Sequence, residues 1–498
     1  MLPEALLLLL HSSIVYAQSR QQLLLNNVAR IATLNQPFFV IPSVATQATV
    51  SVALCAAGSS PRFFVSNSST SDSPGSSGGP NVFEIPLDEG QGSWTGGFPN
   101  GGVLGVENVG QASFEVGLSD NGTLHERMSS PPMLGDTTSN QAIIFSHVFS
   151  NFSLDEPSYP NYTLPSANAP APTPPDTTKL NFTMFLSPTS TLPDIPKTGC
   201  ALRAQTSAGR IDREVPWLKD DEGWRQQWFL TGLTPSTNYT AYAVQEGTRV
   251  SGPTMFATKP GEYRIFDPSQ HLTCNPASFS CPLVASLPFC PGIAYPVPLP
   301  PPPAAASFYD ASTIPDAISA PLISGLANFT ASLLTFACGK DYYSPLASCA
   351  DCQREYRKWL CTISFPRCSE PNPGDPASFT RVPASPGATG LGARPTLGGP
   401  QQVFSALLPQ PTSATPRNPN FPSLGREWTM LLPCLETCYA VDRACPNFLG
   451  FRCPLRRFNA AATYGVGYID TGDHDGKQGT GVTGASQDRW GNTWCNAG

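Results

Sequence analysis

Two cysteines three positions apart, Cys349 and Cys352, are the residues of this chain whose types and spacing point most directly to chemistry. A C-x-x-C pair supplies two ligands of a zinc site, forms a redox-active dithiol, or anchors two structural disulfides. The compartment decides among the three, because structural disulfides persist where the environment is oxidising.

Several features of the chain predict secretion. Residues 1–17 have an apolar core and end in a small-residue cleavage site, which indicates a signal peptide. The chain also carries N-x-Ser/Thr sequons, which predict glycosylation at Asn67, Asn121, Asn151, Asn161, Asn181, Asn238 and Asn328. We therefore predict structural disulfides, with zinc binding and redox chemistry as the alternatives.

Cysteines are concentrated in the second half of the chain. The disulfide candidates there are Cys274, Cys281, Cys290, Cys338, Cys349, Cys352, Cys361, Cys368, Cys434, Cys438, Cys445, Cys453 and Cys495. A bridge that closes a loop of about 15 residues contributes roughly 3 kcal/mol. Cys55 and Cys200 are candidate partners in the first half. Because the chain has 15 cysteines, we expect at least one free or intermolecular thiol.

Two helices must position many of these cysteines. Cys349 and Cys352 share one helical stripe with Tyr356 and Leu360, and basic residues occupy the opposite face. Similar spacing returns at Cys434, Cys438, Val441 and Cys445. We therefore predict two amphipathic helices whose buried sides carry the cysteines.

The motif from Cys338 to Cys368 contains Asp341-Tyr342-Tyr343, the Cys349 and Cys352 pair, and Trp359-Leu360-Cys361. Further motifs lie at residues 434–438, 444–446, 464–468 and 491–495. Together they resemble the fungal MID family of stretch-activated, calcium-permeable channel components, which act beside a large voltage-gated-type channel subunit. The resemblance is specific over residues 336–498. Animal proteins that accompany a sodium leak channel are similar in this half, and the cysteine arrangement resembles the frizzled-type cysteine-rich domain.

The resemblance implies an extracellular accessory subunit of a plasma-membrane calcium channel, which supports calcium influx in response to membrane stretch or stress. The implied partner is the large voltage-gated-type calcium channel subunit, and membrane association would occur through that partner. The implied route is the secretory pathway to the extracellular face of the plasma membrane, with the endoplasmic reticulum as a second location. Tyr342, Tyr343 and Trp359 are then partner contacts or core aromatics. The alternative is a secreted cell-wall adhesive or ligand-binding glycoprotein with a frizzled-like module.

Composition excludes other classes. The formal net charge is −7 and no basic patch is present, so we expect no nucleic acid partner. None of the five histidines lies in a catalytic or metal-pair spacing, and no nucleotide-binding fingerprint occurs. We therefore predict no enzyme, no cofactor and no metal site. At residues 470–476, clustered acids favour a solvated turn, with calcium binding as the alternative.

The fold class that we predict is multidomain, with N-terminal all-β sandwich-type domains followed by an α-helical, disulfide-rich, frizzled-like cysteine-rich domain. Short strands at 38–41, 48–55, 63–65, 82–85, 103–109, 112–118 and 143–148 predict a first sandwich over residues 18–156. Residues 157–176 form a Pro-rich linker. Residues 177–262 predict a second, fibronectin III-like sandwich, in which Tyr239 occupies the position of a tyrosine corner.

Residues 263–498 form the predicted cysteine-rich domain, with a disordered Pro-rich insertion at 370–426 and a mobile polyproline stretch at 291–303. Residues 317–338 have apolar side chains at helical spacing, interrupted by serines and by the sequon asparagine Asn328. This pattern predicts an amphipathic helix packed on a protein core, with a membrane span as the alternative.

Overall fold

The structure is a computed structural model. It describes residues 20–32, 38–58, 60–68, 73–79, 81–108, 110, 113–152, 159–160, 162–176, 181–261, 264–265, 273–274, 281–304, 306–339, 341–370, 406–413, 415–454, 460–465 and 495–498. The chain divides into two compact units. The first unit comprises Met1–Glu126 and Asp194–Ala204, and the second comprises Arg127–Pro193 and Gln205–Gly498. The predicted signal peptide lies outside the described residues.

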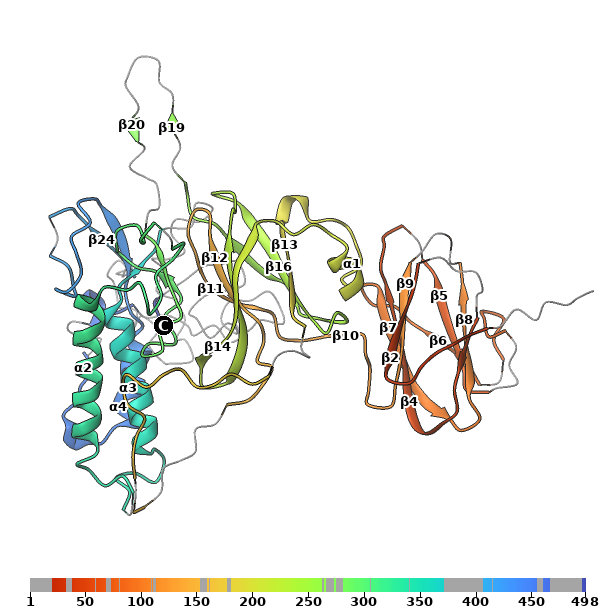
Figure 1. Ribbon diagram of the computed structural model, residues 1–498, viewed down its shortest axis with the longest axis horizontal. Helices are drawn as coiled ribbons and strands as arrows, with labels where there is room; N and C mark the ends of the chain where they lie inside the picture. The colour runs from red at the N-terminus through yellow and green to blue at the C-terminus, as the bar shows by residue number, and fades with distance from the viewer. Residues whose placement is uncertain are drawn as a thin grey trace, which may run out of the picture. The chain divides into compact units, whose positions relative to one another are not determined.

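The first unit is a sandwich of two sheets (Figure 1). One sheet has the order β1-β3-β8-β5-β6, with β1 (Gln21–Gln22), β3 (Phe38–Ile41), β8 (Gly102–Glu107), β5 (Arg62–Ser66) and β6 (Val82–Ile85). The other has the order β2-β9-β4-β7, with β2 (Asn27–Ile31), β9 (Phe114–Ser119), β4 (Val44–Leu54) and β7 (Gln91–Phe98).

The core of the first unit lies between these two sheets. Val50 and Val52 of β4 face it, because alternate residues of a strand point to the same side. The Phe114 ring contacts the rings of Phe39 and Phe63 edge-on, with centroids 6.3 Å and 5.2 Å apart. The N-terminal part is a β-sandwich, as the predicted fold class requires, and six of the seven predicted strand segments coincide with its strands, but the unit ends at Glu126 and not at residue 156.

Residues 194–204 also belong to the first unit and include the short helix α1 (Gly199–Arg203). The Thr198 side chain caps this helix and donates a hydrogen bond to the Leu54 carbonyl. Cys200 forms a disulfide with Cys55 at the end of β4. A segment more than 70 residues beyond β9 in sequence is thereby fixed to the first sandwich.

The second unit begins with another sandwich. One sheet has the order β10-β17-β16-β13, with β10 (Glu126–Arg127), β17 (Arg249–Val250), β16 (Asn238–Gln245) and β13 (Thr183–Pro188), and β18 (Thr254–Ala257) also pairs with β16. The other has the order β11-β12-β15-β14, with β11 (Met133–Thr137), β12 (Ala142–Phe145), β15 (Gly223–Thr231) and β14 (Arg210–Asp220).

The predicted tyrosine corner is present in this sandwich. The backbone N–H of Thr234 donates to the Tyr239 hydroxyl oxygen over 2.8 Å, and the Tyr239 ring stacks on Phe256 in the core. Because this bond ties the start of β16 back to the preceding turn, it fixes the entry of the strand.

Strand β12 differs from the prediction in its place. The sequence pattern puts it in the first sandwich, but it pairs with β15 of the second. Both faces of its sheet are covered. Ile144 and Trp228 face the opposite sheet, whereas Ile143 and Phe229 pack against residues 283–308. A strand buried on both sides reads as a continuous apolar run, and such a run carries no sign of its partner.

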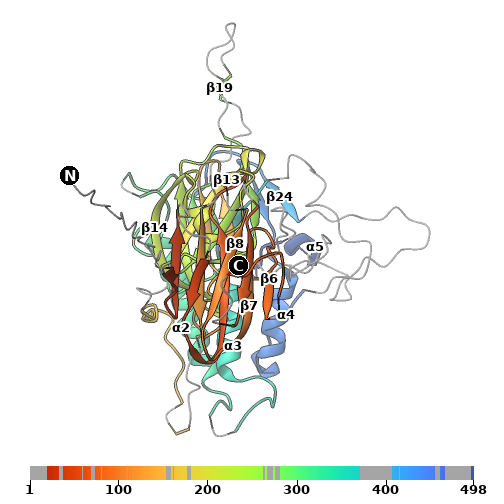
Figure 2. The same cartoon turned by 90° about the vertical axis from the view of Figure 1, so that its right-hand side faces the viewer.

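A helical layer completes the second unit (Figures 1 and 2). Its helices are α2 (Asp316–Leu333), α3 (Cys349–Ser364), α4 (Leu435–Ala444) and α5 (Ala460–Thr463), with 3-10 turns η1 (Thr189–Thr191) in the sandwich and η2 (Asn447–Leu449) after α4. Short strand pairs are β19 (Arg264–Ile265) with β20 (Thr273–Cys274) and β21 (Leu283–Val284) with β22 (Tyr295–Pro296). A small sheet joins β23 (Arg367–Cys368), β25 (Trp428–Leu431) and β24 (Leu407–Gln410).

Helix α2 confirms the predicted amphipathic helix. It buries Ile318, Leu322 and Leu326 in a cluster that it shares with α3, and it leaves Asn328 exposed. Across the described chain, the helices lack the length and apolar character that a membrane span requires. With sandwiches first and a disulfide-rich helical part after them, the predicted fold class is confirmed.

The polyproline stretch 291–303 is not the mobile loop that its composition predicts. Ile293, Tyr295, Val297 and Leu299 are buried in the cluster that packs on α2 and α3. These residues alternate with Pro296 and its neighbouring prolines, and proline suits an extended backbone that needs few hydrogen bonds. The burial of the alternating apolar side chains therefore orders this segment despite its high proline content.

Two other Pro-rich predictions need the same correction in their described parts. In the predicted linker, Tyr162 and Leu164 pack on the helical layer, and the Gln353 side chain donates to the Pro165 carbonyl over 2.9 Å. In the predicted disordered insertion 370–426, residues 407–410 form β24 and Phe421 is buried. Neighbouring apolar surface orders segments that would not order alone.

A buried ion pair links the sandwich of the second unit to its cysteine-rich part. The Arg367 guanidinium lies 2.6 Å from the Asp136 carboxylate, and the two side chains are 3% and 5% exposed. Lys259 lies 3.7 Å from the same carboxylate. The predicted second sandwich and cysteine-rich region thus share one compact unit.

Candidate partner-binding site

Seven disulfides organise the described chain. The pairs are Cys55–Cys200, Cys281–Cys368, Cys290–Cys361, Cys338–Cys349, Cys352–Cys445, Cys434–Cys495 and Cys438–Cys453. Cys349 and Cys352 are bonded to different partners, so the zinc and dithiol alternatives are wrong for this pair. The remaining candidate is Cys274, whose side chain lies outside the part of the chain that the structure describes.

Two of these bridges lie at one end of the helical layer, and a third lies along α4. Cys338–Cys349 closes the loop between α2 and α3, and Cys352–Cys445 ties the first turn of α3 to the end of α4. Cys438–Cys453 fixes the segment that follows α4. Figure 1 shows that the loop before α3 and the end of α4 lie at the same end of the helices.

Tyr343 is half-buried at this end and packs against the cysteine cluster. Its hydroxyl lies 2.7 Å from the Ser348 carbonyl and 2.5 Å from the Ala444 carbonyl, so it connects the loop before α3 to the last turn of α4. Burial raises the pKa of Tyr343 to about 12. The hydroxyl therefore stays protonated and can donate throughout the neutral range.

Trp359 also packs inside. Its indole N–H donates to the Tyr464 hydroxyl over 2.9 Å, and its ring meets Phe451 edge-on at 4.9 Å. Next to it, Tyr356 stacks on Phe329 of α2 with centroids 3.5 Å apart. Of the three aromatic residues predicted as contact or core, Tyr343 and Trp359 thus lie in the packing between helices.

The start of α3 is held by a capping box. The Ser348 hydroxyl accepts from the Asp351 backbone N–H, and the Asp351 carboxylate accepts from the Ser348 backbone N–H over 2.8 Å. Burial opposes ionisation of Asp351, but these bonds and the Arg354 guanidinium outweigh it and lower its pKa. Arg354 also pairs with Asp221 at 2.7 Å, which joins α3 to the turn between β14 and β15.

Tyr342 is the predicted residue that faces solvent. Its side chain is 69% exposed. Two residues that sequence reasoning missed share this environment, since Leu346 is 93% exposed and Phe448 is 84% exposed. We call Tyr342, Leu346 and Phe448 the bundle tip. They are the three most exposed large apolar side chains among the described residues. Isolated apolar residues in a turn do not predict such exposure from the sequence.

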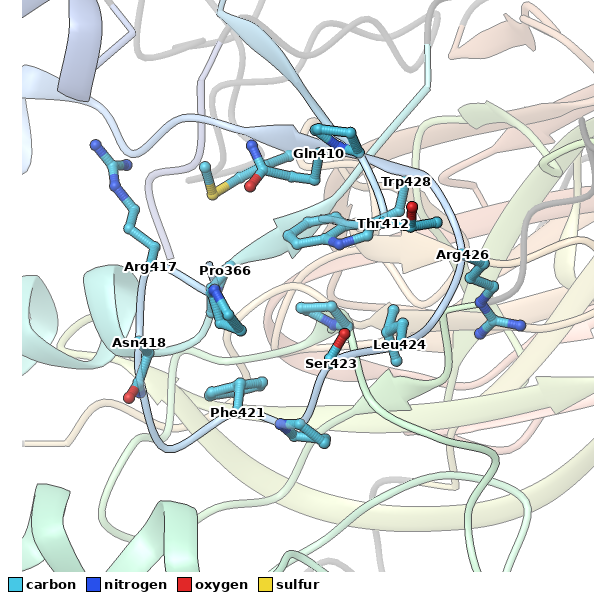
Figure 3. A pocket seen from close by; sticks show the side chains of 15 residues that line it. Pro366, Gln410, Thr412, Arg417, Asn418, Phe421, Ser423, Leu424, Arg426 and Trp428 are labelled. Carbon is cyan, nitrogen blue, oxygen red and sulfur yellow. The ribbon is translucent and has the colours of Figure 1, made fainter. Parts of the chain in front are cut away.

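A second feature is the hollow beneath the connection between β24 and β25 (Figure 3). Trp428, Phe421 and several prolines line it, together with Gln410 and Asn418. Its volume is about 30 Å³, whereas small-molecule sites commonly enclose at least about 300 Å³. The hollow is therefore too small to serve as a ligand pocket in this conformation.

The other predicted sites are distributed over the surface. Asn121, Asn151, Asn181, Asn238 and Asn328 are exposed and Asn67 is half-buried. Asn161 and the acidic segment 470–476 lie outside the described residues. Within the described chain, each of the two clusters with metal-ligand geometry contains a pair of bridged cysteines. A bridged sulfur is not a thiolate, so these clusters offer no cysteine ligands.

Two sandwiches, seven bridges and a helical end with exposed apolar side chains define a disulfide-stabilised β-sandwich protein with a cysteine-rich helical module. Residues 43–480 match the Mid1 family, described as a stretch-activated Ca2+-permeable channel component. The chain belongs to this family, as the cysteine motifs predicted.

Three fungal relatives carry the name of a stretch-activated cation channel. The chain is 35% identical to MID1 of Cryptococcus neoformans over 428 residues. This match covers 80% of this chain and 64% of that protein. It is 27% identical to yam8 of Schizosaccharomyces pombe, over 48% of this chain and 41% of that protein. It is 26% identical to MID1 of Saccharomyces cerevisiae, over 46% of this chain and 35% of that protein. The matches span less than two thirds of each relative's length.

Proposed function

We propose that this protein is an extracellular accessory component of a plasma-membrane calcium channel and supports calcium influx in response to membrane stretch or stress. The observation that carries the proposal is the match of residues 43–480 to a family of stretch-activated, calcium-permeable channel components. The seven disulfides support an extracellular place, because such bridges persist in oxidising compartments.

The proposed partner is the large voltage-gated-type calcium channel subunit, and the cysteine-rich half is the part that docks on it. Bridges such as Cys352–Cys445 and Cys290–Cys361 hold the helices in place before binding. A surface ordered in advance loses little conformational entropy on association. We assign no enzymatic reaction to the chain, and the names of the relatives do not favour the cell-wall adhesive alternative.

Affinity purification tests this proposal. The tagged chain is purified from detergent-solubilised native membranes, and the proteins that accompany it are identified by mass spectrometry. We expect a large four-repeat cation-channel subunit in stoichiometric amount. A tagged secreted glycoprotein from the same cells is the control for trapping. Recovery of the folded chain alone, or with wall proteins only, would reject the accessory role.

A further inference from the structure

The bundle tip is an exposed apolar surface that packing inside the chain does not explain. Leu346 is 93% exposed, Phe448 is 84% exposed and Tyr342 is 69% exposed. Exposing one such side chain is common, but a monomeric protein seldom gathers its most exposed apolar residues at one place. The tip therefore has the composition of a contact surface.

Disulfides and hydrogen bonds place the three residues at one end of the helices. Tyr342 and Leu346 lie in the loop that the Cys338–Cys349 bridge closes. The neighbouring Tyr343 hydroxyl lies 2.5 Å from the carbonyl of Ala444, and Phe448 follows in the turn η2. Figures 1 and 2 show the two segments at the same end of the helical layer.

The shape and charge of the tip separate two kinds of occupant. Anchors of protein interfaces commonly fill pockets or border a groove. Here the side chains project from two loops, and the hollow lined by Trp428 and Phe421 belongs to other loops. The segments 334–348 and 446–454 contain three charged residues, Lys340, Asp341 and Arg452, so the formal charge of these two segments is only +1.

From this geometry we infer that the bundle tip inserts into the interfacial region of a phospholipid bilayer. Leucine and phenylalanine side chains gain from leaving water at the boundary of the acyl chains, and tyrosine favours the headgroup level. The bridges Cys338–Cys349 and Cys438–Cys453 constrain the conformations of both loops, so insertion requires no refolding. The contact adds to any contact with a protein partner and does not depend on one.

Cosedimentation with protein-free vesicles tests the inference. The full chain is mixed with sucrose-loaded phosphatidylcholine vesicles at millimolar lipid, and the bound fraction is measured. We expect the native chain to bind. The variant Tyr342→Ser/Leu346→Ser/Phe448→Ser should bind the vesicles more weakly by a factor on the order of ten or greater, because each apolar side chain contributes to the free energy of transfer from water to the bilayer. These side chains are exposed, so the variant should fold and secrete normally.

The control is Ile211→Ser/Met255→Ser/Leu408→Ser, which removes three exposed apolar side chains elsewhere in the same unit. It should bind vesicles like the native chain. Absence of vesicle binding by the native chain, or equal loss in both variants, overturns the inference. In affinity purification from detergent-solubilised membranes, the tip variant should retain the same protein partners as the native chain. If it loses that partner while the native chain ignores vesicles, the tip is a protein contact instead.

Discussion

At the scale of single residues, two adjacent tyrosines differ in what their hydroxyls do. The Tyr343 hydroxyl lies within hydrogen-bond distance of the backbone carbonyls of Ser348, before α3, and Ala444, at the end of α4, whereas Tyr342 is 69% exposed. Tyr343→Phe should therefore lower the free energy of unfolding by about 1 kcal/mol. Tyr342→Phe is the matched control and should leave it unchanged. Urea denaturation of the purified chain measures both, and equal effects would contradict these roles.

Lys219 offers a test of pH dependence. Burial lowers its pKa from 10.5 to about 8, and its ammonium lies 3.3 Å from the Gly498 carbonyl. Between these two values the unfolded chain holds a proton that the folded chain has released, so stability should rise with pH across this window. Below pH 8 both states are protonated and the destabilisation is constant.

Lys219→Met should remove this rise and stabilise the protein at neutral pH by roughly 3 kcal/mol at most. Lys358→Met removes a nearby positive charge that contributes less than burial to the lowered pKa of Lys219, so it should keep most of the rise. Denaturation midpoints measured from pH 7 to 10.5 provide the comparison. If stability still rises with pH in the Lys219 variant, the rise comes from another titratable group.

The identity and spacing of the residues predicted the buried cysteines but not the exposed apolar side chains. The pattern around Cys349 and Cys352 predicts bridges on the buried side of a helix, and both cysteines are buried there. The exposure of Leu346 and Phe448 could not be predicted, because exposure depends on which loops meet at the end of the bundle. A Leu in a turn is equally compatible with a small local cluster.

At the scale of elements, the disulfides differ in how much chain they constrain. Cys338–Cys349 joins residues 11 apart, and Cys352–Cys445 joins residues 93 apart. On loop entropy alone, replacing the second pair with alanines should cost about 2 kcal/mol more than replacing the first. Thermal unfolding of the two double variants measures this difference. A larger loss from the short loop would show that local packing, not chain entropy, dominates.

Strand periodicity predicted six strands of the first sandwich, and helical spacing predicted α2 and α3. It misplaced β12, because partner choice is decided by the surface that covers a fully apolar strand. It also treated residues 291–303 as mobile, although Tyr295 and Val297 are core residues. Proline content describes the isolated segment, and burial against α2 and α3 reverses its effect.

At the scale of the whole molecule, the Asp136–Arg367 pair joins two regions that the sequence presents as separate domains. Asp136→Ala leaves a buried guanidinium without its nearest carboxylate, so we expect a loss of about 3–5 kcal/mol. Arg210→Ala removes an exposed pair with Asp212 and should cost less than about 1 kcal/mol. Similar losses in both variants, measured by denaturation, would contradict the idea that this pair couples the regions.

The proposed role of the chain is to support calcium entry. The most direct measurement is calcium uptake after hypo-osmotic swelling in a yeast strain whose own relative has been deleted, with and without expression of this chain. We predict that expression restores uptake toward the level of the undeleted strain, and that Cys352→Ala/Cys445→Ala restores less in proportion to its surface amount. Uptake that stays at the deletion level, although the chain reaches the cell surface folded and bridged, would contradict this role.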